Sequence, residues 1–257
     1  MSRRRIHNEY SYLLHRRPYS ETSLLVDLFT REHGRIAAIA KGARRLKSRF
    51  RGALQPFQEL VVQYSGKGEV RTMTLAEPVV AREFLSRERL LCGYYMSELV
   101  IRMLHRFDPH EVLYDAYKEA IQLIRGNQET QQVLRQFEKT LLEEVGYGLH
   151  LEQEPATGRN IERGVLYRYR PGTGPTRYDG KQGEGVLVHG DSLLALSLGA
   201  TLDARSRLEL KRLTRGVLTE HMNGRVIHSR AIYGKLFPGL DVDDELAEKD
   251  QQSETRN

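Results

Sequence analysis

The stretch TSLLVDLFTREHGRIAAIAKG, residues 22–42, predicts two β-strands joined by a tight turn. Its first half, 22–30, is rich in branched and aromatic side chains, which favour strands. A short turn at Glu32-His33-Gly34 follows, and a second apolar run over 33–42 begins within that turn. We therefore expect a β-hairpin.

Three more segments flanking this hairpin have the pattern of short strands. They are YSYLLHRRP (10–18), QELVVQYS (58–65) and GKGEVRTMTLAEP (66–78). Five strands in so short a length favour a closed or nearly closed barrel, because closure removes exposed strand edges. We expect this barrel to form an N-terminal domain over residues 1–80.

From residue 84 the apolar period becomes helical. One helix start is expected at Asp108-Pro109-His110-Glu111, with Asp108 as the cap. The stretch 147–190 is dense in Gly and Pro and has β-like pieces. The helix that starts at Asp108 is expected to run to Arg125. The other expected helices lie at 86–107, 130–148, DSLLALS (191–197) and 203–222, and the β-like pieces lie at 165–170 and 185–189.

These patterns predict an α+β fold. A mainly α-helical domain over 81–240, with a small β or irregular insert at about 149–190, follows the barrel. Residues 241–257 have almost no apolar content, so the sequence predicts a disordered acidic tail there.

Positive charge is concentrated at the front of the chain. The whole chain carries a net +6. Residues 1–80 hold 15 Lys/Arg against 7 Asp/Glu, or +8, whereas residues 241–257 hold 2 against 7, or −5. The segment KGARRLKSRFRG (41–52), between the third and fourth expected strands, has no acid. Its cations are Lys41, Arg44, Arg45, Lys47, Arg49 and Arg51.

This charge favours a polyanion as the partner, and a nucleic acid above all. Lys and Arg release condensed counterions from phosphates, and small barrels track single strands with basic loops and stacking rings. Candidate rings are Phe50, Phe57 and Tyr64, although Phe57 and Tyr64 also suit the core. The alternative for the loop is a solvated surface with no partner. Further cations that could widen the path are Arg16, Arg17, Arg35, Lys67 and Arg71.

A second basic stripe is expected on the 203–222 helix. Arg207, Lys211 and Arg215 are four residues apart, so they share one side of a helix. The stripe could extend a binding path, or it could be the ordinary solvent face of an amphipathic helix.

Signals for catalysis, metals and membranes are weak. The sequence has no phosphate-binding loop, no His-Glu-x-x-His pair and no Gly-x-Ser-x-Gly elbow, so we expect no enzyme and no catalytic residue. One cysteine, Cys92, excludes an internal disulfide and a multi-cysteine zinc site. No apolar run reaches the roughly 18 residues of a membrane span, and the basic N-terminus lacks the apolar part of a secretory signal. We expect no cofactor, no membrane partner and a cytoplasmic location.

Several motifs, taken in order, resemble the bacterial recombination mediator and DNA repair family RecO. The strongest are SETSLLVDLFTREHGRIAAIAKGAR (20–44), RGALQPF (51–57) and GKGEVRTMTLAEPV (66–79), and weaker ones occur in the expected helices. The resemblance covers about residues 10–240.

This resemblance implies an N-terminal OB-fold barrel, a helical domain and no catalytic turnover. It implies binding to single- and double-stranded DNA, annealing of complementary strands, and work at the nucleoid. The implied protein partners are RecR, the acidic C-terminal tail of the single-strand-binding protein SSB and, indirectly, RecA. By the family's pattern the SSB tail would dock at LRQFEKTLL (134–142), with Arg135 as the cation, or Arg135 is an ordinary solvent-face residue. Many relatives hold a four-cysteine zinc module near the Gly/Pro-rich insert, where this chain has no cysteine, so we expect no metal.

Two other classes of function stay open at this point. An RNA-binding or ribosome-associated factor would use the same barrel and charge. A pure interaction scaffold would use the loop for an acidic protein. The acidic tail could also fold back on the basic loop and compete with DNA.

Overall fold

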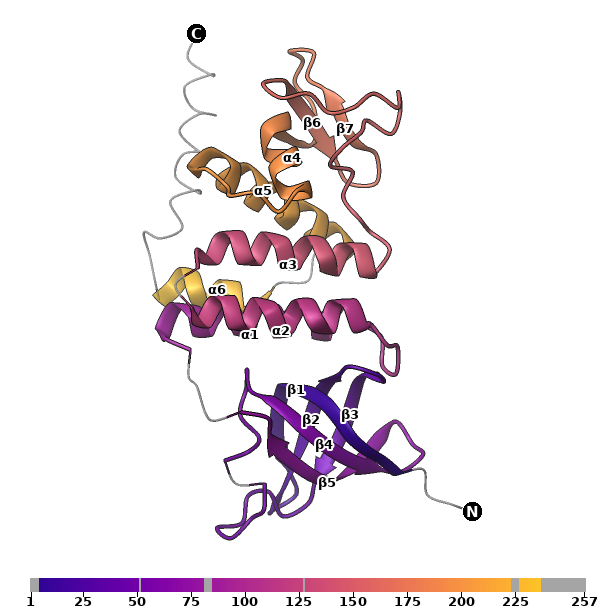
Figure 1. Cartoon of the computed structure of the whole chain (residues 1–257), viewed down its shortest axis with the longest axis vertical. Helices are drawn as coiled ribbons and strands as arrows, with labels where there is room; N and C mark the ends of the chain where they lie inside the picture. The colour runs from indigo at the N-terminus through magenta and orange to yellow at the C-terminus, as the bar shows by residue number, and fades with distance from the viewer. Residues whose placement is uncertain (1–4, 51, 81–84, 127, 223–226, 237–257) are drawn as a thin grey trace. The chain divides into compact units, whose positions relative to one another are not determined.

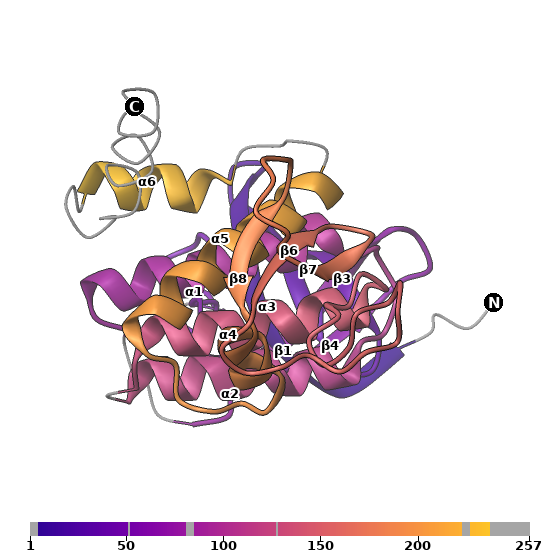
Figure 2. The same ribbon diagram turned by 90° about the horizontal axis from the view of Figure 1, so that it is seen from above.

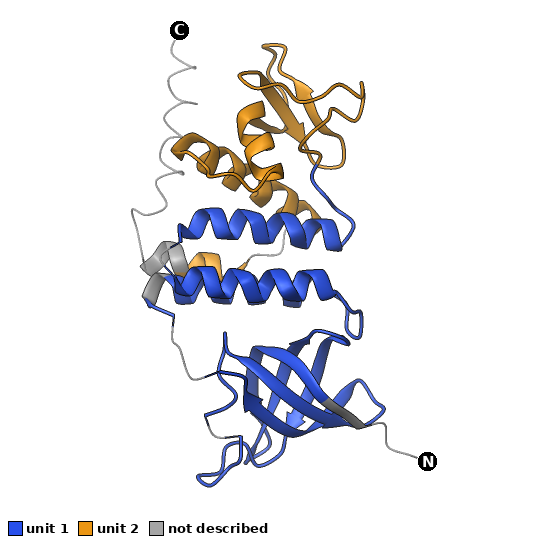
Figure 3. Cartoon of the chain, in the orientation of Figure 1, with its two compact units in different colours: residues 1–149 blue, residues 150–257 orange. Residues whose placement is uncertain are grey.

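The computed structural model describes residues 5–50, 52–80, 85–126, 128–222 and 227–236. The chain forms two compact units, residues 1–149 and residues 150–257 (Figure 3). Within these described ranges, the first unit contains the barrel together with three helices. The acidic segment 241–257 lies outside the described residues.

The N-terminal strands close into a barrel, as the sequence predicted (Figure 1). The spatial order is β1-β2-β3-β5-β4, and β1 also pairs with β4. Four of the five pairings are antiparallel, and β3 runs parallel to β5. The strands are β1 (Arg5–Tyr19), β2 (Ser23–Thr30), β3 (Gly34–Ala40), β4 (Glu59–Ser65) and β5 (Val70–Pro78).

Strand β1 is longer than expected because it belongs to both seams of the barrel. Its N-terminal half pairs with β4, and its C-terminal half pairs with β2. The register with β2 shifts between Leu13 and His15, and such an irregularity bends a strand. The barrel interior is filled by apolar side chains such as Leu13, Val26 and Ile36, which are fully buried.

Helices α1 (Arg87–Met103), α2 (Glu111–Arg125) and α3 (Thr130–Glu144) complete the first unit. Aromatic rings join the barrel to α2: Tyr12 lies 5.6 Å from Tyr114 and 5.0 Å from Tyr117, measured between ring centroids. The hydroxyl of Tyr114 donates to the buried carboxylate of Glu59 at 3.1 Å. Burial raises the pKa of both Tyr12 and Tyr114, so these phenols stay neutral. The contact between the barrel and α2 is therefore an apolar core that contains one buried, hydrogen-bonded carboxylate, that of Glu59.

The expected cap at Asp108 is wrong, because α2 starts later. Its N-cap is His110, whose Nδ1 lies 3.2 Å from Oε2 of Glu144. The preceding segment instead pairs with the start of β3: the amide of Phe107 donates to the carbonyl of Arg35 at 3.0 Å. A Cβ at Gly34, where φ is +67°, would lie 1.9 Å from the carbonyl oxygen of Asp108. This pairing, which local sequence does not encode, delays the helix.

Among its described residues, the second unit holds a small sheet and three helices (Figure 2). The sheet order is β7-β6-β8, and the predicted pieces at 165–170 and 185–189 correspond to β6 and β8. Strand β7 was not predicted, because its sequence GPTR carries two residues that usually break strands. The elements are β6 (Leu166–Arg170), β7 (Gly174–Arg177), β8 (Val186–His189), α4 (Gly190–Ser197), α5 (Ala204–His221) and α6 (His228–Leu236).

One buried arginine organises the loop that connects β7 to β8. The guanidinium of Arg168 donates to the carbonyls of Lys181 and Gly183, and it lies 5.2 Å from the centroid of the Tyr178 ring. Nearby, the hydroxyl of buried Tyr169 accepts from the amide of His150, and burial raises the pKa of Tyr169 to about 12. A cation on a strand thus holds a loop that has no strand or helix of its own.

Candidate nucleic-acid interface

The basic segment forms the first part of the connection between β3 and β4, as expected. It is built from consecutive tight turns, with backbone hydrogen bonds from Ala43 to Ala40, from Arg45 to Gly42 and from Ser48 to Arg45. Gly42 has a φ of +69°, a conformation that favours glycine at this turn. Beyond the turns the connection enters the barrel core. The segment is therefore a compact loop with one anchored end.

Two arginines hold this connection against the barrel. The amide of Arg44 donates to the carbonyl of Thr22 at 2.9 Å, and its side chain donates to the carbonyl of Ser20 at 3.2 Å. Both acceptors lie in the turn between β1 and β2. On β1, Arg16 donates from its guanidinium to the carbonyl of Leu54. These contacts fix the loop, so Arg44 and Arg16 position it as well as adding charge.

Three cations of the loop remain available for an outside partner. The side chains of Lys41, Arg45 and Lys47 are exposed and have no acidic or hydrogen-bonding partner within the part of the chain that the structure describes. The guanidinium of Arg49 lies 5.0 Å from the centroid of the Phe50 ring. Arg51 lies outside the described residues. We call Lys41, Arg45 and Lys47 the free cations of the loop.

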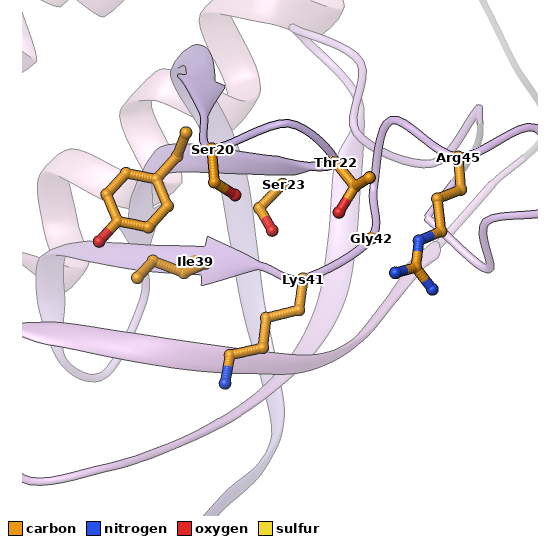
Figure 4. Close-up of a pocket in the computed structure, with 8 residues that line it drawn as sticks. Ser20, Thr22, Ser23, Ile39, Lys41, Gly42 and Arg45 are labelled. Carbon is orange, nitrogen blue, oxygen red and sulfur yellow. The ribbon is translucent and has the colours of Figure 1, made fainter.

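A hollow lies beside two of these free cations (Figure 4). Its volume is about 550 Å³. Figure 4 shows Ser20 and Thr22 in the turn between β1 and β2, Ser23 at the start of β2, and Lys41 and Arg45 in the segment that follows β3. The lining residues are Tyr19, Ser20, Thr22, Ser23, Ile39, Lys41, Gly42 and Arg45. The hollow is thus open, hydroxyl-rich and positively charged.

The expected stacking rings do not face solvent. Phe50, Phe57 and Tyr64 are buried at 2%, 3% and 3% relative exposure, so the core alternative given for Phe57 and Tyr64 is confirmed and the stacking role expected for Phe50 is wrong. The ring beside the loop is that of Tyr19, which is 49% exposed and lines the hollow. One signal in the sequence could have identified Tyr19, because it ends a strand directly before the polar turn Ser20-Glu21-Thr22.

The flanking cations divide into two kinds. Arg17 and Lys67 are exposed and could add charge to the barrel surface. Arg35 faces α1, where its guanidinium donates to the carbonyl of Ile101, and burial lowers its pKa. Arg71 donates to the carbonyl of Gly66 and lies 5.0 Å from the centroid of the Phe107 ring. The contacts of Arg35 and Arg71 are those of structural residues.

The second predicted stripe does not form an exposed face. Lys211 is buried at 8% relative exposure, and Arg207 and Arg215 are half-buried. All three have interactions within the molecule. Burial of this side of α5 follows from the apolar residues that alternate with the cations, including Leu210 and Leu218. Contrary to the expectation, the stripe is not displayed to a phosphate backbone.

Arg135 is also buried, contrary to both expectations for it. Its Nη2 lies 2.8 Å from Oε1 of Glu138, and the relative exposures of the two residues are 3% and 0%. The hydroxyl of Tyr95 donates to the same oxygen at 2.5 Å. The cation is thus committed to an internal acid.

One group of described side chains could in principle hold a metal ion: Glu9, Glu32 and His33. Both oxygens of the buried Glu9 carboxylate already have partners. Oε1 accepts from the amide of Glu32 at 2.8 Å, and Oε2 lies 2.8 Å from Nδ1 of His33. Through these contacts Glu9 holds the turn between β2 and β3 in place.

Within the described residues, no helix is both long and apolar enough to cross a membrane.

Comparison with protein families gives two matches that together cover most of the chain. Residues 1–82 match the family model described as Recombination protein O N terminal. Residues 85–231 match the model described as Recombination protein O C terminal. The first match contains the whole barrel and the loop.

Individual relatives agree over nearly their full length. The chain is 41% identical over 225 residues to the DNA repair protein RecO of Methylococcus capsulatus, covering 88% of this chain and 92% of that protein. It is 41% identical over 226 residues to the DNA repair protein RecO of Nitrosococcus oceani, with the same coverage of 88% and 92%. The protein of that name from Azoarcus sp. is 37% identical over 239 residues, covering 91% of this chain and 98% of that protein.

Proposed function

Since the chain belongs to the recombination protein O family of DNA repair proteins, we propose that it is a recombination mediator that works by binding DNA. In this proposal it binds single- and double-stranded DNA, anneals complementary strands, and with RecR helps RecA to load onto SSB-coated single strands. It turns over no substrate and works in the cytoplasm at the nucleoid. The observation that carries the proposal is the group of free cations on a closed barrel.

The physical step that the loop would assist is the approach of two polyanions. Complementary strands repel each other, and cations that replace condensed counterions lower this repulsion. Lys41, Arg45 and Lys47 are free to make such contacts, whereas Arg44 and Arg16 hold the loop in place. Contacts of this kind position DNA and carry no sequence information. We therefore expect nearly sequence-independent binding, with Arg17, Lys67 and Arg49 extending the charged surface.

The protein partners would bind a different kind of surface from the one that binds DNA. The acidic SSB tail ends in apolar residues, so its dock needs a cation beside an apolar groove. Arg135 would have to leave Glu138 to serve as that cation, and removal of one partner from a buried ion pair costs about 3–5 kcal/mol. We therefore do not assign the SSB tail to Arg135, and we propose binding of RecR and SSB from the family membership alone.

A strand-annealing assay with a charge-matched control tests the proposal. One variant changes Lys41, Arg45 and Lys47 to Ala. The control changes Arg159, Arg163 and Lys181 to Ala, three exposed cations of the second unit, so that both variants lose the same charge. We expect the loop variant to anneal complementary strands, bare or SSB-coated, at least ten times more slowly, and the control to anneal as the native chain does. Equal annealing by all three proteins would overturn the role of the loop.

Competition with RNA separates the proposal from its main alternative. The barrel and its charge suit either nucleic acid, so a single-stranded RNA of equal length is added to the native protein bound to DNA. Preference for DNA, or equal binding, fits a recombination mediator. A strong preference for RNA would favour an RNA-binding factor, and negligible binding of both at physiological salt would favour a protein scaffold.

A further inference from the structure

We propose that the hollow at the end of β1 holds one unpaired nucleobase stacked on Tyr19, while Lys41 and Arg45 bind the phosphates on either side of it. The inference rests on the proposed DNA-binding function and adds to it a residue that separates single strands from duplexes. The starting observation is that Tyr19 is 49% exposed yet lines a hollow of about 550 Å³. Sites for small molecules typically have about 300–1,000 Å³.

The composition of the hollow suits a base with its backbone. The Tyr19 ring provides a flat apolar face, and the half-buried Ile39 provides an apolar contact from β3. Stacking on an aromatic ring is available to every base, because each base has a π-face. Around this apolar part, Ser20, Thr22 and Ser23 offer hydroxyls and Lys41 and Arg45 offer cations (Figure 4).

The hollow is held in shape before any ligand arrives. Tyr19 pairs with Ser23 across the end of the β1–β2 hairpin. The two hydrogen bonds from Arg44 to the carbonyls of Ser20 and Thr22 join the loop to this hairpin. Ser20 has a φ of +53°, an uncommon backbone conformation that the pairing maintains. The backbone that carries the ring and the cations is therefore held in place, which reduces the entropy lost on binding.

The geometry predicts a difference between single strands and duplexes. In a duplex the bases are stacked on one another, so only phosphates reach the free cations. In a single strand a base can leave its neighbours and stack on Tyr19. The cations therefore serve both kinds of DNA, and Tyr19 serves only the unpaired strand. That division fits a protein that must hold one strand until its complement arrives.

The test measures affinity for a single-stranded oligonucleotide and for a duplex of equal length at fixed salt. The variants are Tyr19→Ala, Tyr19→Phe and the double variant Lys41→Ala/Arg45→Ala. Tyr10→Ala is the matched control, because Tyr10 is 47% exposed on the same strand but lies far along β1 and outside the hollow. A 2-aminopurine base in the single strand reports stacking through quenching of its fluorescence.

We expect Tyr19→Ala to weaken single-strand binding by about 5- to 100-fold and duplex binding by less than about twofold. Tyr19→Phe and Tyr10→Ala should bind as the native chain does, and at saturating protein quenching should disappear only in Tyr19→Ala. The double variant should weaken binding of both DNAs.

Each other result overturns the inference in a distinguishable way. If Tyr19→Ala is silent while the double variant weakens both DNAs, the stacking role is wrong and the proposed DNA-binding function stands. If Tyr19→Ala weakens both DNAs equally, the hollow does not separate single strands from duplexes. If no variant changes binding, the loop is not the DNA site, and the inference falls together with the proposed site.

Discussion

Arginines near the barrel differ in what their guanidinium groups bind. Arg16, Arg35 and Arg71 each donate to a backbone carbonyl, and such contacts hold connections in place. Arg45 and Arg17 have no comparable contact within the described residues and extend into solvent. Substitution of an arginine that binds a backbone carbonyl should therefore change stability, whereas substitution of a solvent-exposed arginine should change DNA affinity.

Arg35→Ala should lower the free energy of unfolding by about 1.5–3 kcal/mol, because a half-buried charged hydrogen bond to Ile101 is lost. Chemical denaturation measures this. The salt dependence of DNA binding should not change. Arg17→Ala is the control and should alter stability by less than about 0.5 kcal/mol. A stable Arg35→Ala protein with a flatter salt dependence would show that Arg35 faces DNA.

Sequence could predict the charge of these residues but not their facing. Arg17 lies between Arg16 and Pro18 near the end of β1, and Arg35 lies between Gly34 and Ile36 at the start of β3, and neither local sequence shows what the side chain faces. Arg35 is directed toward α1, whose Ile101 carbonyl accepts from it, and that helix lies far away along the chain. The buried rings of Phe50 and Tyr64 were equally ambiguous, since a barrel needs aromatic side chains in its core as well as on its surface.

At the scale of elements, the joint between barrel and helices depends on close backbone contact. The segment before α2 lies against the start of β3, where the carbonyl of Arg35 accepts from the amide of Phe107. Only a residue without a side chain fits at Gly34, because a Cβ there would overlap the carbonyl of Asp108. The close backbone approach at this point therefore depends on glycine at position 34.

Gly34→Ala should reduce the free energy of unfolding by at least about 2 kcal/mol, from the positive φ together with the overlap. Gly68→Ala is the matched control, because an added Cβ there meets nothing within 4 Å. Urea denaturation of both variants measures the difference. If the two variants are equally stable, the contact between β3 and the segment before α2 is not tight in solution.

The loop before β8 should depend on Arg168. In Arg168→Ala the carbonyls of Lys181 and Gly183 lose their donor, so trypsin should cleave after Lys181 several times faster. The exposed Arg163→Ala provides the control for loss of one charge. Limited proteolysis followed by mass spectrometry locates the cut. Cleavage at the native rate would mean that other contacts hold this loop.

A regular spacing of apolar residues made most strands and helices predictable from sequence. The elements that depend on tertiary contacts were not predictable in this way. Leu60, Val62 and Tyr64 alternate along β4 and all face the barrel core. By contrast, β7 exists because β6 offers it an edge, although its own residues disfavour a strand. The start of α2 also differs from the prediction because of a tertiary contact, the pairing of the preceding segment with β3. The hollow also escaped prediction, since it forms where the β1–β2 turn and the loop after β3 meet in space.

At the scale of the whole molecule, charge is distributed unevenly along the chain. Residues 1–80 carry +8 and residues 241–257 carry −5, counting Lys/Arg against Asp/Glu. The arginines that hold backbone carbonyls and the free cations of the loop both lie in this N-terminal part. Long-range attraction should draw DNA to this part, and salt should weaken that attraction.

Deletion of residues 241–257 should tighten DNA binding at low salt by a few-fold, because a net charge of −5 no longer repels or competes with the phosphates. Near physiological salt the difference should shrink, since exposed charges are screened beyond about 8 Å. Fluorescence anisotropy at two salt concentrations measures both values. Unchanged affinity at low salt would remove the acidic segment from the account.

The most direct test of the loop's role is the salt dependence of single-strand affinity. If the native chain makes four to six phosphate contacts, the slope of log affinity against log salt should be about −3 to −4. Changing Lys41, Arg45 and Lys47 to Ala should flatten this slope by about 2, since each lost contact removes about 0.7. The charge-matched variant of Arg159, Arg163 and Lys181 should keep the native slope. Equal slopes for the native chain and the loop variant would contradict phosphate binding by the loop.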